Sequence, residues 1–152
     1  MAAVDNFSTP NMLNATLPLK QDADSQAKLK AFAAEFKTKW VPKVWEVLKK
    51  SNMVHYARFT VIDGKYMQIL TEYDGDFILY SKFFAKELPD FFRAVFTLVE
   101  GAPPPPAGGE ADLSLIFEFI NKRNLPNVGD VAFSAIGPLR VPEVKRKLDI
   151  TD

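Results

Sequence analysis

The chain of 152 residues contains no cysteine and a single histidine, His55. Without thiols there can be no disulfides, no thiol catalysis and no cysteine-ligated metal. One histidine in a cysteine-free chain also argues against a zinc or copper site. We therefore predict that the protein has no metal and no cofactor.

The chain also lacks net charge, because 19 Lys and Arg residues balance 19 Asp and Glu residues. A protein without an overall field does not attract polyanions, so we expect no nucleic-acid partner. Net charge near zero favours self-association over mutual repulsion.

Long apolar runs are absent as well. No run approaches the roughly 20 residues that span a bilayer, and residues 1–10 lack the basic and apolar regions of a secretory signal. We expect no membrane partner and a cytoplasmic protein.

What is present is apolar and aromatic: 47% of residues are hydrophobic, and phenylalanine occurs 13 times. This composition supports one domain over residues 1–152 with a well-filled core. Residues 1–11 are polar and predict a loose arm. Residues 101–109 carry four consecutive prolines and predict an exposed loop, which is either a spacer or a proline-recognition motif.

A β-hairpin is predicted over residues 54–73. Two β-branched and aromatic runs flank Asp63-Gly64, a pair that favours a two-residue turn. Such a turn would place Ile62 opposite Lys65.

Helical spacing of apolar residues occurs on either side of the hairpin. Asp22 or Asp24 would cap a long helix that ends at Ser51-Asn52 and has a kink or a break at Pro42. The other expected elements are an aromatic-rich helix over 77–99 interrupted at Pro89, a helix over 111–124, strands over 15–19 and 130–136, and a short helical turn near Pro142.

The order strand, helix, strand, strand, helix, extra helix, strand predicts an α+β, ferredoxin-like βαββαβ fold. It would contain a four-stranded antiparallel sheet with two helices on one face. The other face would be covered by a second copy of the chain, and we therefore predict a homodimer.

The run from His55 to Phe84 resembles proteins of the dimeric α/β-barrel superfamily. These carry His-x-x-Arg-Phe on a strand, a turn, a strand ending in Asp-Gly, and a helix that opens with aromatic residues. The resemblance places the chain in an uncharacterised branch, distantly similar to dye-decolourising peroxidase-like domains, and implies a dimeric barrel.

Haem peroxidase activity is not expected from this resemblance. The distal motif of those enzymes is Gly-x-x-Asp-Gly, and here the matching run, Thr71 to Gly75, lacks the first glycine. Those enzymes also need a histidine after the motif, whereas the chain has none beyond His55.

The predicted hairpin register divides its side chains between two faces. Ala57, Phe59, Val61 and Leu70 would lie beneath the helices. The opposite face would line a ligand pocket with Tyr56, Arg58, Thr60, Met67, Thr71 and Tyr73, because these are mostly apolar residues with few directed polar groups.

Arg58 is the central residue of this predicted pocket. A guanidinium in mid-strand requires a carboxylate, a ligand or water. It would therefore form an ion pair or bind a small carboxylate or phenolate.

His55 and Glu72 are the candidate catalytic residues, since the predicted register places them opposite each other. The pair would act as a general base, or the histidine would be a structural strand-end residue. Asp74 or Asp76 would cap the next helix.

These features predict a protein that binds a small hydrophobic, acidic or aromatic molecule. A cofactor-independent isomerase, cyclase or monooxygenase and a non-catalytic dimerisation module are the alternatives. The sequence leaves open whether the protein is an enzyme.

Overall fold

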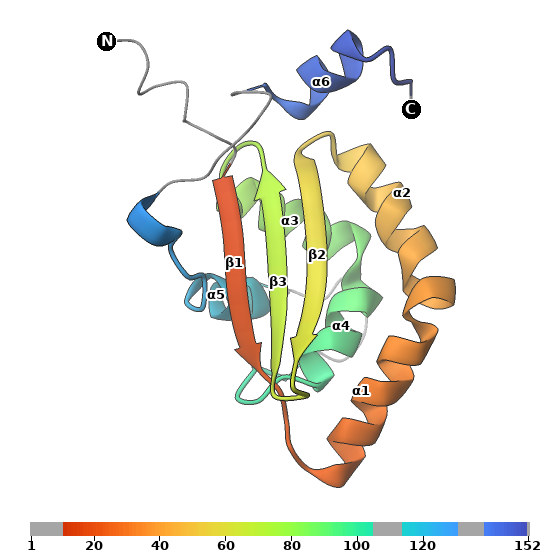
Figure 1. Cartoon of the computed structure of the whole chain (residues 1–152), viewed down its shortest axis with the longest axis vertical. Coiled ribbons are helices and arrows are strands. Elements are labelled where there is room, and N and C mark those ends of the chain that lie inside the picture. The colour runs from red at the N-terminus through yellow and green to blue at the C-terminus, as the bar shows by residue number, and fades with distance from the viewer. Residues whose placement is uncertain (1–10, 105–113, 131–138, 152) are drawn as a thin grey trace.

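The computed structural model describes residues 11–104, 114–130 and 139–151. In chain order the elements are β1 (Asn11–Pro18), α1 (Ala23–Glu35), a π-helical turn (Phe36–Trp40), α2 (Val41–Ser51), β2 (Val54–Ile62), β3 (Tyr66–Tyr73), α3 (Phe77–Glu87), α4 (Pro89–Thr97), α5 (Ser114–Asn121), a 3-10 turn (Val128–Asp130) and α6 (Val141–Lys147) (Figure 1). The class is α+β, as predicted.

The sheet corrects the predicted fold. Within the described residues it is an open, antiparallel, three-stranded sheet of order β1-β3-β2, and neither a four-stranded sheet nor a barrel (Figure 1). Of the predicted last strand, residues 131–136 lie outside the described residues. The edge of β1 is instead met by the segment after α5, where Asn124 bridges Ala15 and the Leu125 N–H donates to the Asn14 carbonyl at 3.0 Å. Contacts between segments this far apart leave no local pattern in the sequence.

Strand β1 begins earlier than predicted, at Asn11 instead of Ala15. Its buried side chains are Leu13, Ala15 and Leu17. This alternation is typical of a strand with one face in the core. The polar residues between them hid the signal, because Asn14 and Thr16 lie on the opposite face.

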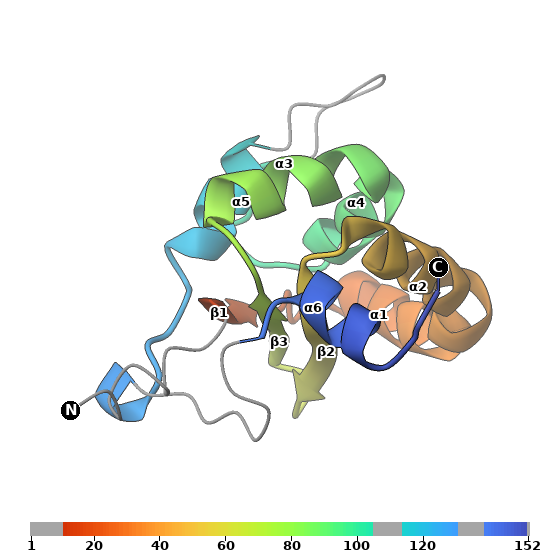
Figure 2. The ribbon, with the colours of Figure 1, turned by 90° about the horizontal axis from the view of Figure 1, so that it is seen from above.

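The longer helices either cover one face of the sheet or lie beside β2. Figure 2 shows α3, α4 and α5 stacked over one face of the sheet, with α1 and α2 alongside β2. The core therefore forms between α3–α5 and the inner sheet face, which carries Met67 and Ile69, each 2% exposed.

The long helix begins at the predicted cap: the Asp22 Oδ1 accepts from the Ser25 N–H at 2.9 Å. The helix is not broken but changes at residues 36–40, which form a π-turn that ends just before Pro42. Pro42 itself lies in the first turn of α2. The extra residue of the π-turn turns the buried Trp40 and half-buried Phe36 toward Phe91.

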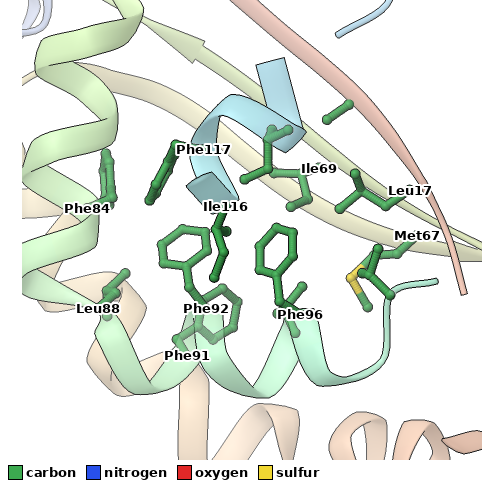
Figure 3. Close-up of a cluster of buried hydrophobic side chains, with 14 of the residues drawn as sticks. Leu17, Met67, Ile69, Phe84, Leu88, Phe91, Phe92, Phe96, Ile116 and Phe117 are labelled. Carbon is green, nitrogen blue, oxygen red and sulfur yellow. The ribbon is translucent and has the colours of Figure 1, made fainter. Parts of the chain in front are cut away.

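The aromatic-rich segment forms two helices separated at Leu88–Pro89, as predicted. Phe91, Phe92 and Phe96 of α4 are all buried (Figure 3). Phe92 and Phe96 contact rings of α5, whereas Phe91 packs against rings of α1, the π-turn and β2. Of the two candidate caps, Asp76 is the one that caps α3, and its Oδ1 accepts from the Leu79 N–H at 2.9 Å.

Candidate functional site

The hairpin turn is built as predicted, but the strand register differs by one residue. Asp63 and Gly64 adopt positive φ angles of 51° and 65°. The Lys65 N–H donates to the Ile62 carbonyl at 2.9 Å. Ile62 nevertheless pairs with Tyr66, which leaves Lys65 outside the ladder.

This one-residue shift moves every β3 side chain to the face opposite the predicted one. The predicted pocket is therefore divided. Tyr56, Arg58 and Thr60 lie on the outer face, away from the helices. Met67, Thr71 and Tyr73 belong to the inner face and are 2–5% exposed.

The three inner residues belong to the core. The rings of Tyr73 and Tyr80 lie 4.5 Å apart, and the Thr71 hydroxyl hydrogen-bonds the Tyr80 hydroxyl at 3.4 Å. Burial raises the pKa of Tyr80 to about 12, and burial also raises the pKa of Tyr73. Both phenols stay neutral at physiological pH, so this cluster is a structural one.

The outer face forms a shallow, mixed surface across all three strands. Its cross-strand rows follow from the register: Tyr56 with Glu72 and Met12, Arg58 with Leu70 and Asn14, Thr60 with Gln68 and Thr16, and Ile62 with Tyr66 and Pro18. Tyr56 is 71% exposed, and Ile62 and Tyr66 are also exposed.

Arg58 is exposed at the centre of β2. Its guanidinium has neither an ion pair nor a hydrogen bond to any described residue. The ion pair that the sequence left open is thus not formed there. The neighbour directly across the ladder is the half-buried Leu70. At the centre of the outer face, the exposed guanidinium of Arg58 therefore lies beside the apolar side chain of Leu70.

His55 does not pair with Glu72. A β-bulge between Val54 and Tyr56 leaves His55 outside the ladder. Its Nε2 lies 3.0 Å from the Asp74 Oδ1, and the histidine side chain is only 9% exposed. The predicted catalytic pair is therefore replaced by a His55–Asp74 pair.

Asp74 is a structural junction. Its Oδ2 accepts from the Val141 N–H at 2.8 Å, and its own N–H donates to the Met53 carbonyl at 2.7 Å. One carboxylate thus ties the end of β3 to the bulge in β2 and to the start of α6.

A pocket that the sequence did not reveal opens at the β1 edge of the outer face. Its volume is about 310 Å³, and its lining is Met12, Asn14, Asn124, Leu125, Pro126 and Asn127. The Asn14 side chain donates to the Asn127 Oδ1 at 2.8 Å and to the Leu125 carbonyl at 3.1 Å. Asn14 belongs to the same row as Arg58, so the pocket continues the outer face.

No group of three or more metal-ligating side chains occurs within residues 11–104, 114–130 and 139–151. None of the helices in these ranges has the length and apolar character needed to cross a bilayer.

Comparisons with known proteins identify no relative: no family model, no curated protein and no solved structure matches the chain. Function must therefore be argued from the geometry of this chain.

Proposed function

We propose that the outer face of the sheet binds a small aromatic or apolar carboxylic acid. The observation that carries the proposal is that Arg58 is exposed beside Leu70 and has no ion pair with any described residue. A guanidinium binds a carboxylate through two parallel hydrogen bonds. Leu70 offers an apolar floor for the rest of the ligand, and the exposed Tyr56 ring stands one position along the same strand face.

The dimensions of the face support a ligand of this size. Arg58 and Asn14 are separated by two strand spacings, roughly 10 Å. An aromatic acid with its carboxylate at Arg58 would extend over Leu70 toward the Asn14 pocket. The amide side chains there would hydrogen-bond a hydroxyl or carbonyl group on its far end.

Binding is preferred to catalysis. A proton-transfer role would need His55 at the ligand, but its side chain is nearly buried and its Asp74 partner also holds Val141. His55 is best explained as part of the junction at the end of the sheet.

The test is calorimetric titration with benzoate, phenylacetate and indole-3-acetate, with the matching primary amides as uncharged controls. We expect the acids to bind and the amides to bind at least tenfold more weakly. Arg58→Ala should weaken acid binding about ten- to a hundredfold, since a charge-assisted hydrogen bond contributes about 1.5–3 kcal/mol. Arg58→Lys should bind the acids more tightly than Arg58→Ala but less tightly than the wild type, because lysine keeps the positive charge but cannot form two parallel hydrogen bonds.

Two variants separate a direct contact from a general charge effect. Lys65→Ala removes a cation at the hairpin turn and should leave affinity unchanged. Glu72→Gln removes the carboxylate diagonal to Arg58, roughly 7–8 Å away, and should strengthen acid binding. The proposal fails if Arg58→Ala and Lys65→Ala have equal effects.

The alternative is that the same face joins two copies of the chain. The exposed side chains of Tyr56, Ile62 and Tyr66 would then form the apolar contact between the two copies. Sedimentation equilibrium at micromolar concentration should then give a dimer that Tyr56→Asp dissociates. A monomer at all concentrations would leave the face to a ligand.

A further inference from the structure

Charge is unevenly distributed in this neutral chain. Residues 23–51, which form α1, the π-turn and α2, carry seven lysines and three acidic residues, a net charge of +4. Residues 140–147, which include α6, carry four basic residues and one acidic residue, a net charge of +3. The remaining residues therefore carry −7.

The two basic segments lie side by side. The Lys145 Nζ of α6 donates to the Asn52 Oδ1 at 2.7 Å and to the Lys49 carbonyl at 3.3 Å. Figures 1 and 2 both show α6 beside the end of α2. Together these two adjoining segments, which we call the basic side, carry a net charge of +7, although the whole chain has no net charge.

Two exposed apolar side chains lie on α2 within this basic side. Trp45 is 62% exposed and Val41 is 40% exposed. They are four residues apart on α2 and so share a face. Lys37 precedes Val41 by four residues and Lys49 follows Trp45 by four, and both lysines are exposed. We call Lys37, Val41, Trp45 and Lys49 the Trp45 row.

The row has a definite chemical pattern: a cation, two apolar side chains and a cation, followed by the cations of α6. Lys49 has an exposed partner in Glu46 at 2.9 Å, which solvent screens. Lys37 has no ion pair among the described residues. The row spans 12 residues of helix, roughly 18 Å, which matches about five or six residues of extended chain.

We propose that the Trp45 row binds a short acidic segment of another protein. An apolar or aromatic residue of that segment packs on Trp45 and Val41. Carboxylates on either side meet Lys37 at one end and Lys49 with α6 at the other. Tryptophan is a frequent anchor of protein interfaces, and a one-sided basic surface steers an acidic partner toward it.

An anionic membrane surface fits the row less well. The Glu46 side chain is 72% exposed beside Trp45, and Asp149 separates the exposed Leu148 and Ile150. Carboxylates placed among the apolar groups are costly to bury in lipid.

The test measures fluorescence anisotropy of a labelled hexapeptide with two central phenylalanines and two glutamates at each end. We expect saturable binding by the full chain that weakens with added salt. Trp45→Ala should weaken it at least about tenfold, as loss of an anchor does. Lys37→Glu should weaken it about fivefold, in the range of one exposed charge pair.

The matched control is Lys82→Glu on α3, which reverses the charge of an exposed lysine outside the basic side. It should leave peptide binding unchanged. Far-ultraviolet circular dichroism checks that each variant keeps its fold, as expected for exposed positions. Vesicles with 30% phosphatidylserine form a second arm, and the proposal predicts no Trp45-dependent sedimentation with them.

Three results would overturn the proposal. One is the absence of peptide binding up to millimolar concentration. Another is equal loss of affinity in Lys37→Glu and Lys82→Glu, which would indicate a nonspecific charge effect. The third is Trp45-dependent binding to vesicles without binding to the peptide.

Discussion

Replacement of Phe91 by alanine should remove a large part of the stability of this protein. Phe91 is 1% exposed, and five rings surround it at centroid distances of 5.1–6.3 Å. They are those of Phe32, Phe36, Trp40, Phe59 and Phe92. The residue thus joins α1, the π-turn, β2 and α4.

The expected loss is about 3–5 kcal/mol, the range for truncating a buried phenylalanine to alanine. The upper half of that range is expected, because helices on opposite sides of the cavity cannot collapse into it together. Domains of this size are stable by about 5–15 kcal/mol. The loss is therefore a large share of the total stability, and the variant should unfold at much lower denaturant concentration.

Urea titration followed by circular dichroism measures the loss. Phe83→Ala is the matched control: Phe83 is half-buried and has one ring neighbour among the described residues, Phe84 at 5.1 Å. It should cost less than half as much. Hydrogen exchange should also accelerate more in α1 and α2 than in β1 and β3. A loss below about 1 kcal/mol, or equal losses in the two variants, would refute this account of the core.

Three further predictions follow from single contacts. Asp76→Ala should cost about 1 kcal/mol in urea titration, since it removes the N-cap of α3; an unchanged midpoint would contradict the cap. Tyr80 should titrate near pH 12 in ultraviolet absorbance. Because its pKa is raised in the folded state, the unfolded chain loses this proton first, so stability should be intact below pH 10 and fall as pH rises toward 12. Tyr80→Phe should reduce that fall, and an equal fall in the variant would assign it to other groups. Asp74→Asn should speed hydrogen exchange in α6 while leaving α4 unaffected, because the carboxylate holds both His55 and the Val141 N–H. Exchange in α6 unchanged from the wild type would show that other contacts hold that helix.

The turn at Asp63-Gly64 shows which features of a hairpin its own residues can predict. The pair predicted positive φ angles, and the structure has them. Whether Lys65 then enters the ladder is not a property of the turn residues. In the fold, the Lys65 carbonyl accepts from the Leu19 N–H at 2.8 Å, a contact with the chain segment after β1. That neighbour is 46 positions away in sequence, so the predicted register was wrong by one residue.

The candidate site changed for the same reason. Arg58 was singled out from sequence as a costly mid-strand cation, and in the structure it is exposed and has no ion pair with any described residue. Thr71 and Tyr73 looked like pocket residues only because the register had placed them beside it. Asn14 and Asn124 carried no signal, since amide residues 110 positions apart become neighbours only when the chain after α5 reaches β1.

The sequence by itself determined the elements with local causes: the amphipathic helices, a helix cap at Asp22 or Asp24, the break at Pro89 and the hairpin turn. Each depends on side chains within a few residues of one another, so periodicity and turn chemistry suffice. Tertiary structure alone decided the number of strands in the sheet, the face on which each β3 side chain lies and the partner of His55. Those depend on which distant segments pack together, and a one-residue difference in pairing reverses the faces of a strand.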